Sequence, residues 1–323
     1  MIVAPFVGEA LSTSTPPFTL LLPQNLILLG LLYGGGALLC REVTARWRGG
    51  WTTLVLLAAA YGVFEEALIV RSWFDPTFSD TARTNAYSRI WQTNVLVAVH
   101  ITVFHIAVSM IASLVIVELM FPGWQRKPWC GRRTLGWIAL AMPALAALSW
   151  SPGGFYRAPV AQVSMAAVLC LALVVAARLT AAVRWPRPAP PTSTRRHRPR
   201  LGLLAFTATL GHFVLAWASP AIGWPWPLAL VLVIGLLVGA VALGRRMAAG
   251  RPAPEVAWSV VSGMLAVLLL VDLLVASRGR VDLVLGALLA AVVLARLRPG
   301  DHTARWWSAR PAHTSVPPPP PRP

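Results

Sequence analysis

The chain has 323 residues, of which 57% are hydrophobic and only 12% are charged. Soluble domains are about one quarter charged, so this composition argues against an ordinary soluble globule. The net charge of +17 does not indicate nucleic acid, because the basic residues stand in short segments between apolar runs. An outer-membrane barrel would show alternating segments of about ten residues, which are not visible. Composition therefore predicts an all-α, polytopic membrane protein with no nucleic-acid partner.

Nine apolar segments are long enough, or nearly long enough, to cross a bilayer. The fourth and ninth are the shortest, so these two are the ones that could instead be oddly tilted or re-entrant. In chain order the segments cover about 20–40, 51–70, 94–120, 135–150, 160–179, 202–220, 226–244, 258–276 and 281–297.

The basic residues predict the orientation of these spans. The segments that follow odd-numbered spans carry 22 of the 28 Lys and Arg residues, and those that follow even-numbered spans carry 6. Since Lys and Arg accumulate on the cytoplasmic side, we expect the N-terminus outside and the C-terminus in the cytoplasm. The preference for Arg over Lys, with the Ala, Pro and Leu bias, indicates a GC-rich bacterial genome. The expected location is the bacterial plasma membrane.

The spans divide into two membrane modules, 1–179 and 202–297. A Pro- and Arg-rich segment, 180–201, joins them, and a similar tail, 298–323, follows. Such segments are too rich in proline and charge to pack a core, so both are predicted to be disordered. Their arginines are expected to meet anionic lipid headgroups.

Ionisable residues inside apolar spans are costly and are therefore candidates for function. Glu118 is set aside, because it lies near the cytoplasmic end of its span and can reach the interface. The helical rise places the other six in the outer half of the membrane. They are Glu65, Glu66, His100, His105, His212 and Asp272.

Helical angles relate the residues of the third span to one another. Thr102, His105 and Ser109 fall on one face by the i, i+3, i+4 rule. His100 points about 140° away from His105, so these two histidines are not an ideal pair of ligands.

The same rule applies to the second span. Tyr61 and Glu65 share a face, and Glu66 points about 100° away from it. Arg71 is poorly aligned for an ion pair with Glu66, but its side chain is long enough to reach back toward it.

Three functions fit this polar set. In a metal-dependent hydrolase with a divalent metal such as zinc, His105 and His212 would hold the ion, and Glu65 or Glu66 would activate water. In a proton-coupled transporter or channel, Glu65, Glu66, His105 and Asp272 would carry protons. In a non-catalytic scaffold they would only join helices. The sequence has no nucleotide-binding glycine loop and no GxSxG motif, which disfavours ATP-driven pumping and serine hydrolysis.

Four stretches carry a resemblance to uncharacterised prokaryotic multi-pass membrane proteins, over residues 8 to 122. The stretches are "STSTPPF", "LLYGGGALLCREV", "AAYGVFEEALIVRSWFDP" and "HITVFHIAVSMIASLVIVELMFP".

The double glutamate also resembles a motif of the CAAX-protease and bacteriocin-processing (CPBP) family of intramembrane metalloproteases, which carries EExxxR, FxxxH and HxxxN or HxxxD. Glu65 and Glu66 match the paired glutamates, but Arg71 stands one position late. His105 matches the second motif with Ile101 in place of Phe, and His212 matches the third without its Asn or Asp. The resemblance implies an intramembrane metallopeptidase in which these residues form the metal centre.

The orientation is tested by reporter fusions after residues 48, 80, 198 and 320. We expect a cytoplasmic signal at 48, 198 and 320 and an external signal at 80, as the distribution of basic residues requires. An external signal at 198 would contradict the predicted topology.

Overall fold

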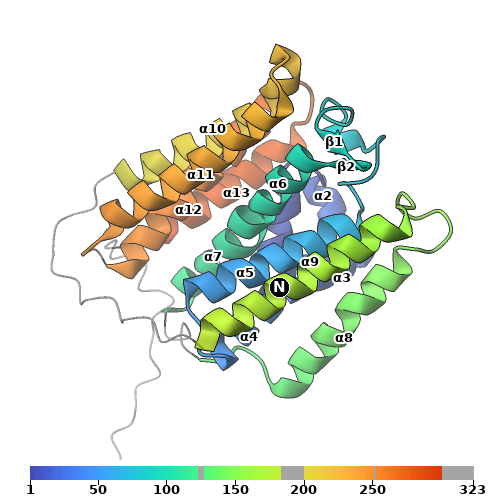
Figure 1. Cartoon of the computed structure of the whole chain (residues 1–323). Helices are drawn as coiled ribbons and strands as arrows, with labels where there is room; N and C mark the ends of the chain where they lie inside the picture. Colours follow the sequence, from blue (N-terminus) through green and yellow to red (C-terminus); the bar gives the residue numbers. More distant parts are fainter. Residues whose placement is uncertain (123–126, 183–199, 251, 300–323) are drawn as a thin grey trace, which may run out of the picture.

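The computed structural model describes residues 1–122, 127–182, 200–250 and 252–299. Within these ranges the chain is helical apart from loops and one short hairpin (Figure 1). Seven helices are long and apolar enough to cross a bilayer, which confirms the predicted all-α, polytopic membrane fold. They are Pro23–Arg46, Trp51–Ile69, Val95–Met120, Val160–Ala182, Arg200–Ile222, Trp226–Ala248 and Ala253–Ala276.

The first three of these helices each contain a π-helical stretch. The first comprises α3 (Pro23–Leu29), η2 (Gly30–Gly35) and α4 (Gly36–Arg46), and the second α5 (Trp51–Val63) and η3 (Phe64–Ile69). The third comprises α6 (Val95–Phe104), η5 (His105–Ala112) and α7 (Ser113–Met120). The remaining four are α9 (Val160–Ala182), α10 (Arg200–Ile222), α11 (Trp226–Ala248) and α12 (Ala253–Ala276).

Two shorter helices stand where the fourth and ninth spans were expected. These are α8 (Arg132–Leu148), with 17 residues and Pro143 inside it, and α13 (Asp282–Arg296), with 15 residues. Both fall below the length at which the other seven qualify as spans. The count of nine spans therefore stays a prediction.

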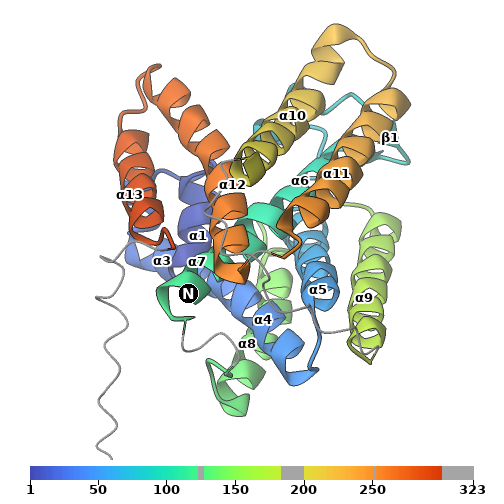
Figure 2. The same ribbon diagram turned by 90° about the vertical axis from the view of Figure 1, so that its left-hand side faces the viewer.

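The third spanning helix lies at the centre of the bundle. Its segments α6, η5 and α7 contact α4 and α5 on one side and α10 and α12 on the other. In the same bundle α9 packs on α5, α8 on α4, α11 on α10 and α6, and α13 on α12 (Figures 1 and 2). Residues of this helix therefore face both groups of helices.

The first twenty residues are part of the bundle, which the sequence did not predict. They form α1 (Val3–Pro5), η1 (Phe6–Ala10) and α2 (Pro17–Leu20). Val7 and Leu11 are buried in one cluster with residues of η5, α7, α12 and α13. The N-terminal segment thus fills the space between the central helix and the last two helices.

The loop between the second and third spanning helices has its own structure. It contains a single turn, η4 (Ser79–Thr81), and the hairpin of β1 (Arg89–Ile90) and β2 (Thr93–Asn94). Trp91 and Gln92 between the strands have positive φ, as a tight two-residue hairpin turn requires. Asn94 caps α6 by accepting from the backbone N–H of Val97 at 3.1 Å, so the loop is joined firmly to the helix.

The outer helices expose apolar side chains to their surroundings. On α9 and α11, exposed residues include Val168, Leu171, Leu179, Val231 and Val238. Apolar faces of this extent are unusual on soluble proteins and fit contact with lipid.

Near the C-terminal end of α4, a buried carboxylate is fully paired. Glu42 accepts from Arg41 Nη1 at 2.6 Å and from the backbone N–H of Trp129 at 2.8 Å, and it also accepts from Arg46. Arg46 Nη2 donates to the carbonyl of Cys130 at 2.9 Å. The charges thus join α4 to the start of the chain segment that leads into α8.

The expected disordered segments lie almost wholly outside the described residues. Only the ends of 180–201 and the first two residues of 298–323 are described.

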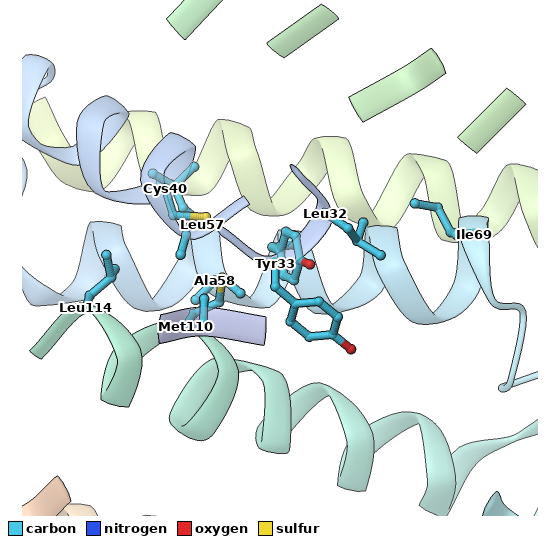
Figure 3. Close-up of a cluster of buried hydrophobic side chains, with 12 residues drawn as sticks. Leu32, Tyr33, Cys40, Leu57, Ala58, Ile69, Met110 and Leu114 are labelled. Carbon is cyan, nitrogen blue, oxygen red and sulfur yellow. The ribbon is translucent and has the colours of Figure 1, made fainter. Parts of the chain in front are cut away.

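A glycine allows α4 and α5 to approach closely beside the buried cluster in Figure 3, which includes Tyr33, Leu57, Ala58 and Met110. A Cβ added at Gly36 would overlap the ring of Tyr61. At Gly30, one turn and a half earlier, an added Cβ would meet nothing within 4 Å.

We expect Gly36→Ala to lower the free energy of unfolding by about 1–3 kcal/mol, because the Tyr61 ring has to move. Gly30→Ala is the matched control and should be neutral or slightly stabilising, since Ala favours a helix over Gly. Unfolding of the detergent-solubilised protein, followed by circular dichroism, measures both. An equal loss in the two variants would contradict this packing.

Candidate functional site: a buried Glu/His cluster

The π-helical stretches converge on one place in the bundle. η1 contributes Glu9, η2 contributes Tyr33, η3 contributes Glu65 and Glu66, and η5 contributes His105. A π turn inserts an extra residue and rotates the side chains that follow, and such turns are frequent at functional sites. Both glutamates of the second spanning helix reach the same partner from such a stretch.

The imidazole of His105 lies between the two carboxylates. Its Nε2 is 2.7 Å from Glu66 Oε1, and its Nδ1 is 3.2 Å from Glu65 Oε2. Nδ1 is also 3.1 Å from Ser109 Oγ, which shares its helix face as the spacing predicted. Glu65, Glu66 and His105 are 1%, 8% and 2% exposed, so this contact is shielded from bulk solvent.

A second carboxylate group lies beside these three residues. Glu9 Oε1 accepts from the hydroxyl of Tyr33 at 2.5 Å, and Glu9 Oε2 accepts from Thr15 Oγ1 at 2.6 Å. The Tyr33 ring centre is 6.0 Å from that of His105. On the other side, Ser72 donates to Glu66 Oε2. The cluster therefore consists of two hydrogen-bonded groups, one on the N-terminal segment and one at the end of η3, which meet where the rings of Tyr33 and His105 are in contact.

The N-terminal segment reaches the cluster because of a glycine. A Cβ at Gly8 would stand 2.8 Å from Tyr33 Cε1 and 2.9 Å from Ser109 Oγ. Only a residue without a side chain lets η1 come this close, and this approach positions Glu9.

Two buried polar atoms of the cluster have no hydrogen-bond partner among the described residues. They are Tyr61 Oη and Glu65 Oε2, of which the second still lies 3.2 Å from His105 Nδ1. Buried polar groups are almost always paired, so each orphan calls for an explanation such as an ion, a water or a ligand.

The cluster faces a cavity of about 860 Å³. Besides Glu9, Tyr33, Glu65, Glu66 and His105, the cavity is lined by the turn at Ser12–Thr15, by η4 and by the loop after α8. This volume lies within the range typical of small-molecule sites.

Glu65, Glu66 and His105 can hold a metal ion. One donor atom from each lies within 4.8 Å of the other two, and carboxylate and imidazole are donors that zinc accepts. Three protein donors leave one position open for water, as catalytic zinc sites do. The orphan Glu65 Oε2 fits the same interpretation.

His212 is placed beside His100 and not in this donor group. His100 Nδ1 and His212 Nε2 are 2.9 Å apart, and the rings are stacked with centres 4.8 Å apart. Phe213 and Trp217 pack edge-on against His100. The helical-angle argument had separated His100 from His105, but the sequence offered no sign that His100 would be the partner of His212.

Asp272 also lies outside the donor group. Its side chain is fully buried in α12, and neither carboxylate oxygen has a hydrogen-bond partner within the described ranges. The structure thus unites three of the predicted polar residues and leaves Asp272 and the His100–His212 pair apart.

Arg71 points away from the glutamates and holds the loop between α8 and α9. Nε donates to the carbonyl of Tyr156 at 2.5 Å, and Nη2 and Nη1 donate to the carbonyl and hydroxyl of Ser149 at 2.8 and 2.9 Å. The guanidinium also lies 4.4 Å from the ring centre of Trp150. Arg71 has φ of +64°, a strained conformation for a residue with a side chain, which directs it toward the loop.

Sequence analysis missed Glu9, Tyr33 and Ser72. Glu9 precedes the first expected span, and Tyr33 and Ser72 are not ionisable near neutral pH, so a search for charges inside spans passes over all three. The signal that could have found Glu9 is the stretch "GEALSTST", which combines a carboxylate with a run of hydroxyls.

We expect Arg71→Leu to lower the free energy of unfolding by about 2–3 kcal/mol, because several buried hydrogen bonds from one charged group are lost. Amide hydrogen exchange in residues 149–156 should rise at the same time. Arg157→Leu removes an exposed arginine from the same loop and should change neither quantity appreciably. Equal behaviour of the two variants would show that Arg71 does not anchor the loop.

Comparison with known proteins gives one match. No curated protein and no solved structure matches the chain. The family model of an uncharacterized membrane protein family matches residues 1–297, so the resemblance to such proteins is confirmed and extends well beyond residue 122. The chain belongs to this uncharacterized membrane protein family.

Proposed function

We propose that the chain is an intramembrane metal-dependent hydrolase that acts as a peptidase. The observation that carries the proposal is the donor set of Glu65, Glu66 and His105, within 4.8 Å of one another and facing the cavity. Catalytic zinc sites use three protein ligands, typically His and carboxylate, and leave the fourth coordination position open for water. The three residues here match that number and that chemistry. Peptide as the substrate rests on the likeness of the double glutamate to the CPBP metalloproteases.

A divalent ion such as zinc would supply a water of lowered pKa and polarise the carbonyl to be attacked. The residues of the chain have separate tasks around it. Glu65, Glu66 and His105 hold the donor positions, and Ser72 and Ser109 orient Glu66 and His105 by hydrogen bonds.

Glu9 is the carboxylate best placed to accept a proton. It lines the cavity but lies outside the donor group, so it stays available as a base. Its hydrogen bonds from Tyr33 and Thr15 fix its orientation. A positioned carboxylate of this kind typically contributes a factor of about 10²–10⁴ to a rate.

Proton-coupled transport is the second candidate, and a specific feature favours it. Thr15, Glu9 and Tyr33 form one hydrogen-bonded chain, and Ser72, Glu66 and His105 form another beside it. Adjacent chains of this type are suited to proton transfer. The scaffold alternative accounts less well for the orphan atoms and for the cavity.

The distribution of basic residues also bears on the location and the orientation of the chain in the membrane. We infer a bacterial plasma membrane protein with nine spans, an external N-terminus and basic segments that contact anionic lipid headgroups. The cluster would then lie in the outer half of the membrane.

Metal content tests the proposal. Purified without chelators, the protein should carry about one divalent ion per chain, and Glu65→Gln, Glu66→Gln and His105→Ala should each lose it. His212→Ala is the matched control, because His212 stands outside the donor group, and it should keep the ion. Elemental analysis and an unfolding curve are measured on every variant.

The alternatives have distinct outcomes. Loss of the ion from a folded His212→Ala variant would restore the donor set that the sequence predicted. No ion in the wild-type protein would reject the hydrolase, and pH-driven uptake into vesicles would then test transport.

A further inference from the structure

The cavity beside the cluster is acidic in a chain that is otherwise strongly basic. Four of the 11 acidic residues of the chain line it, namely Glu9, Glu65, Glu66 and Asp80. No Lys or Arg lines it within the described residues, although the chain has 28. This charge distribution disfavours anionic substrates such as phosphate esters and favours a cation.

Two arginines near the cavity in sequence, Arg71 and Arg89, are engaged elsewhere, whereas Arg83 and Arg157 are exposed and do not line the cavity. Arg71 donates to the loop carbonyls of Ser149 and Tyr156. Arg89 donates to the carbonyls of Asn85 and Gln92, at 3.0 Å each, and also to that of Phe74. These guanidinium groups therefore satisfy backbone carbonyls and not the carboxylates of the cavity.

The hydrogen bonding of one carboxylate at the cavity is incomplete, independently of the charge count. Glu65 Oε2 is buried and accepts no hydrogen bond in the described ranges, where it lies 3.2 Å from His105 Nδ1, and Glu65 itself lines the cavity. Glu9 and Asp80 are not among the three candidate metal donors, so a bound divalent ion would leave both of them at the cavity, where Asp80 is exposed.

The rest of the lining is apolar with a hydroxyl-rich edge. Apolar walls come from α3, η2, η3 and α8, including Leu28, Leu32, Ile69, Leu145 and Leu148. Hydroxyls come from Ser12–Thr15 and from the loop after α8. Such a surface accepts a hydrophobic chain whose backbone amides need hydrogen-bond partners.

We propose that the cavity binds a hydrophobic peptide segment with a Lys or Arg side chain, and that Glu9 and Asp80 select this positive charge. The peptide nature of the ligand rests on the proposed function, whereas the selection for positive charge rests on the cavity itself. A basic side chain near the cluster would place the peptide backbone beside the open metal position.

Three labelled peptides test the selection. They share one hydrophobic sequence and differ in a central Lys, Gln or Glu. Binding to the full chain, reconstituted in zwitterionic nanodiscs and freed of metal with a chelator, is measured by fluorescence anisotropy against empty nanodiscs. The Lys peptide should bind about tenfold more tightly than the Glu peptide, with the Gln peptide between them.

Matched variants assign the effect to the cavity. Asp80→Asn and Glu9→Gln should each reduce the ratio between the Lys and Glu peptides, and Asp80 is exposed, so its variant should fold. Glu255→Gln removes one negative charge from the first turn of α12, outside the cavity lining, and should leave the ratio unchanged. Equal binding of the three peptides, or a ratio that Asp80→Asn and Glu9→Gln leave intact, would overturn the proposal.

Two further results separate this inference from the proposed function. Displacement of the Lys peptide by butylamine at similar concentration would overturn the peptide part, because it would show that the cavity binds any amine. Since binding is measured without metal, selection for Lys in a protein that never carries an ion would reject the hydrolase and keep the cationic ligand.

Discussion

The contact of His105 with Glu65 and Glu66 is the interaction on which the rest of the structure depends. An ionisable group inside a bilayer is costly unless it meets a partner, so the second and third spanning helices have to pack with these side chains face to face. The contact distances of 2.7 and 3.2 Å leave little freedom in that packing. The third spanning helix consequently becomes the central one, and the other helices assemble on its two sides.

The π-helical stretches are the local consequence of this constraint. Glu65 and Glu66 would be about 100° apart on a regular α-helix, and here the His105 imidazole lies between their carboxylates. The extra residue in η3 costs regular hydrogen bonding, and the contacts of both carboxylates offset that cost. In η5, His105 and Ser109 are next to each other, as a spacing of four residues also gives on a regular helix, and in η1 Glu9 meets Tyr33. The irregular backbone is concentrated where the polar side chains are.

The sequence predicted the helices well because the apolar runs are long and the charges between them are clear. The expected spans 51–70 and 94–120 agree closely with Trp51–Ile69 and Val95–Met120. The predictions of side-chain direction were weaker, since they assumed a regular helix throughout. That assumption placed Glu66 away from Glu65, and it could not foresee that Arg71, with its positive φ, would turn to the loop after α8.

Contacts between residues far apart in the chain could not be predicted from the sequence, for a different reason. The choice of His100 as the partner of His212 depends on how α6 and α10 pack, and a single sequence contains no signal for the rotation of one helix against another. The role of Glu9 depends on the N-terminal segment entering the bundle, which apolar content alone does not reveal. Both facts follow from packing between distant segments, so they required the three-dimensional structure.

Glu42 and Glu65 are both almost completely buried, but their hydrogen-bond partners differ. The difference indicates a structural role for Glu42 and a functional role for Glu65. Glu42 accepts hydrogen bonds from two arginines and a backbone N–H, so its charge is balanced and both of its oxygens are paired. Such a pairing joins two segments of the chain and leaves no carboxylate oxygen free to bind a ligand. Among the described residues Glu65 has no arginine partner, its Oε2 lies 3.2 Å from His105 Nδ1 without a hydrogen bond, and a cavity lies beside it. The complete pairing of Glu42 shows that this fold can surround a buried carboxylate with hydrogen-bond donors. The hydrogen bonding of Glu65 is less complete, and the proposed positively charged ligand would complete it.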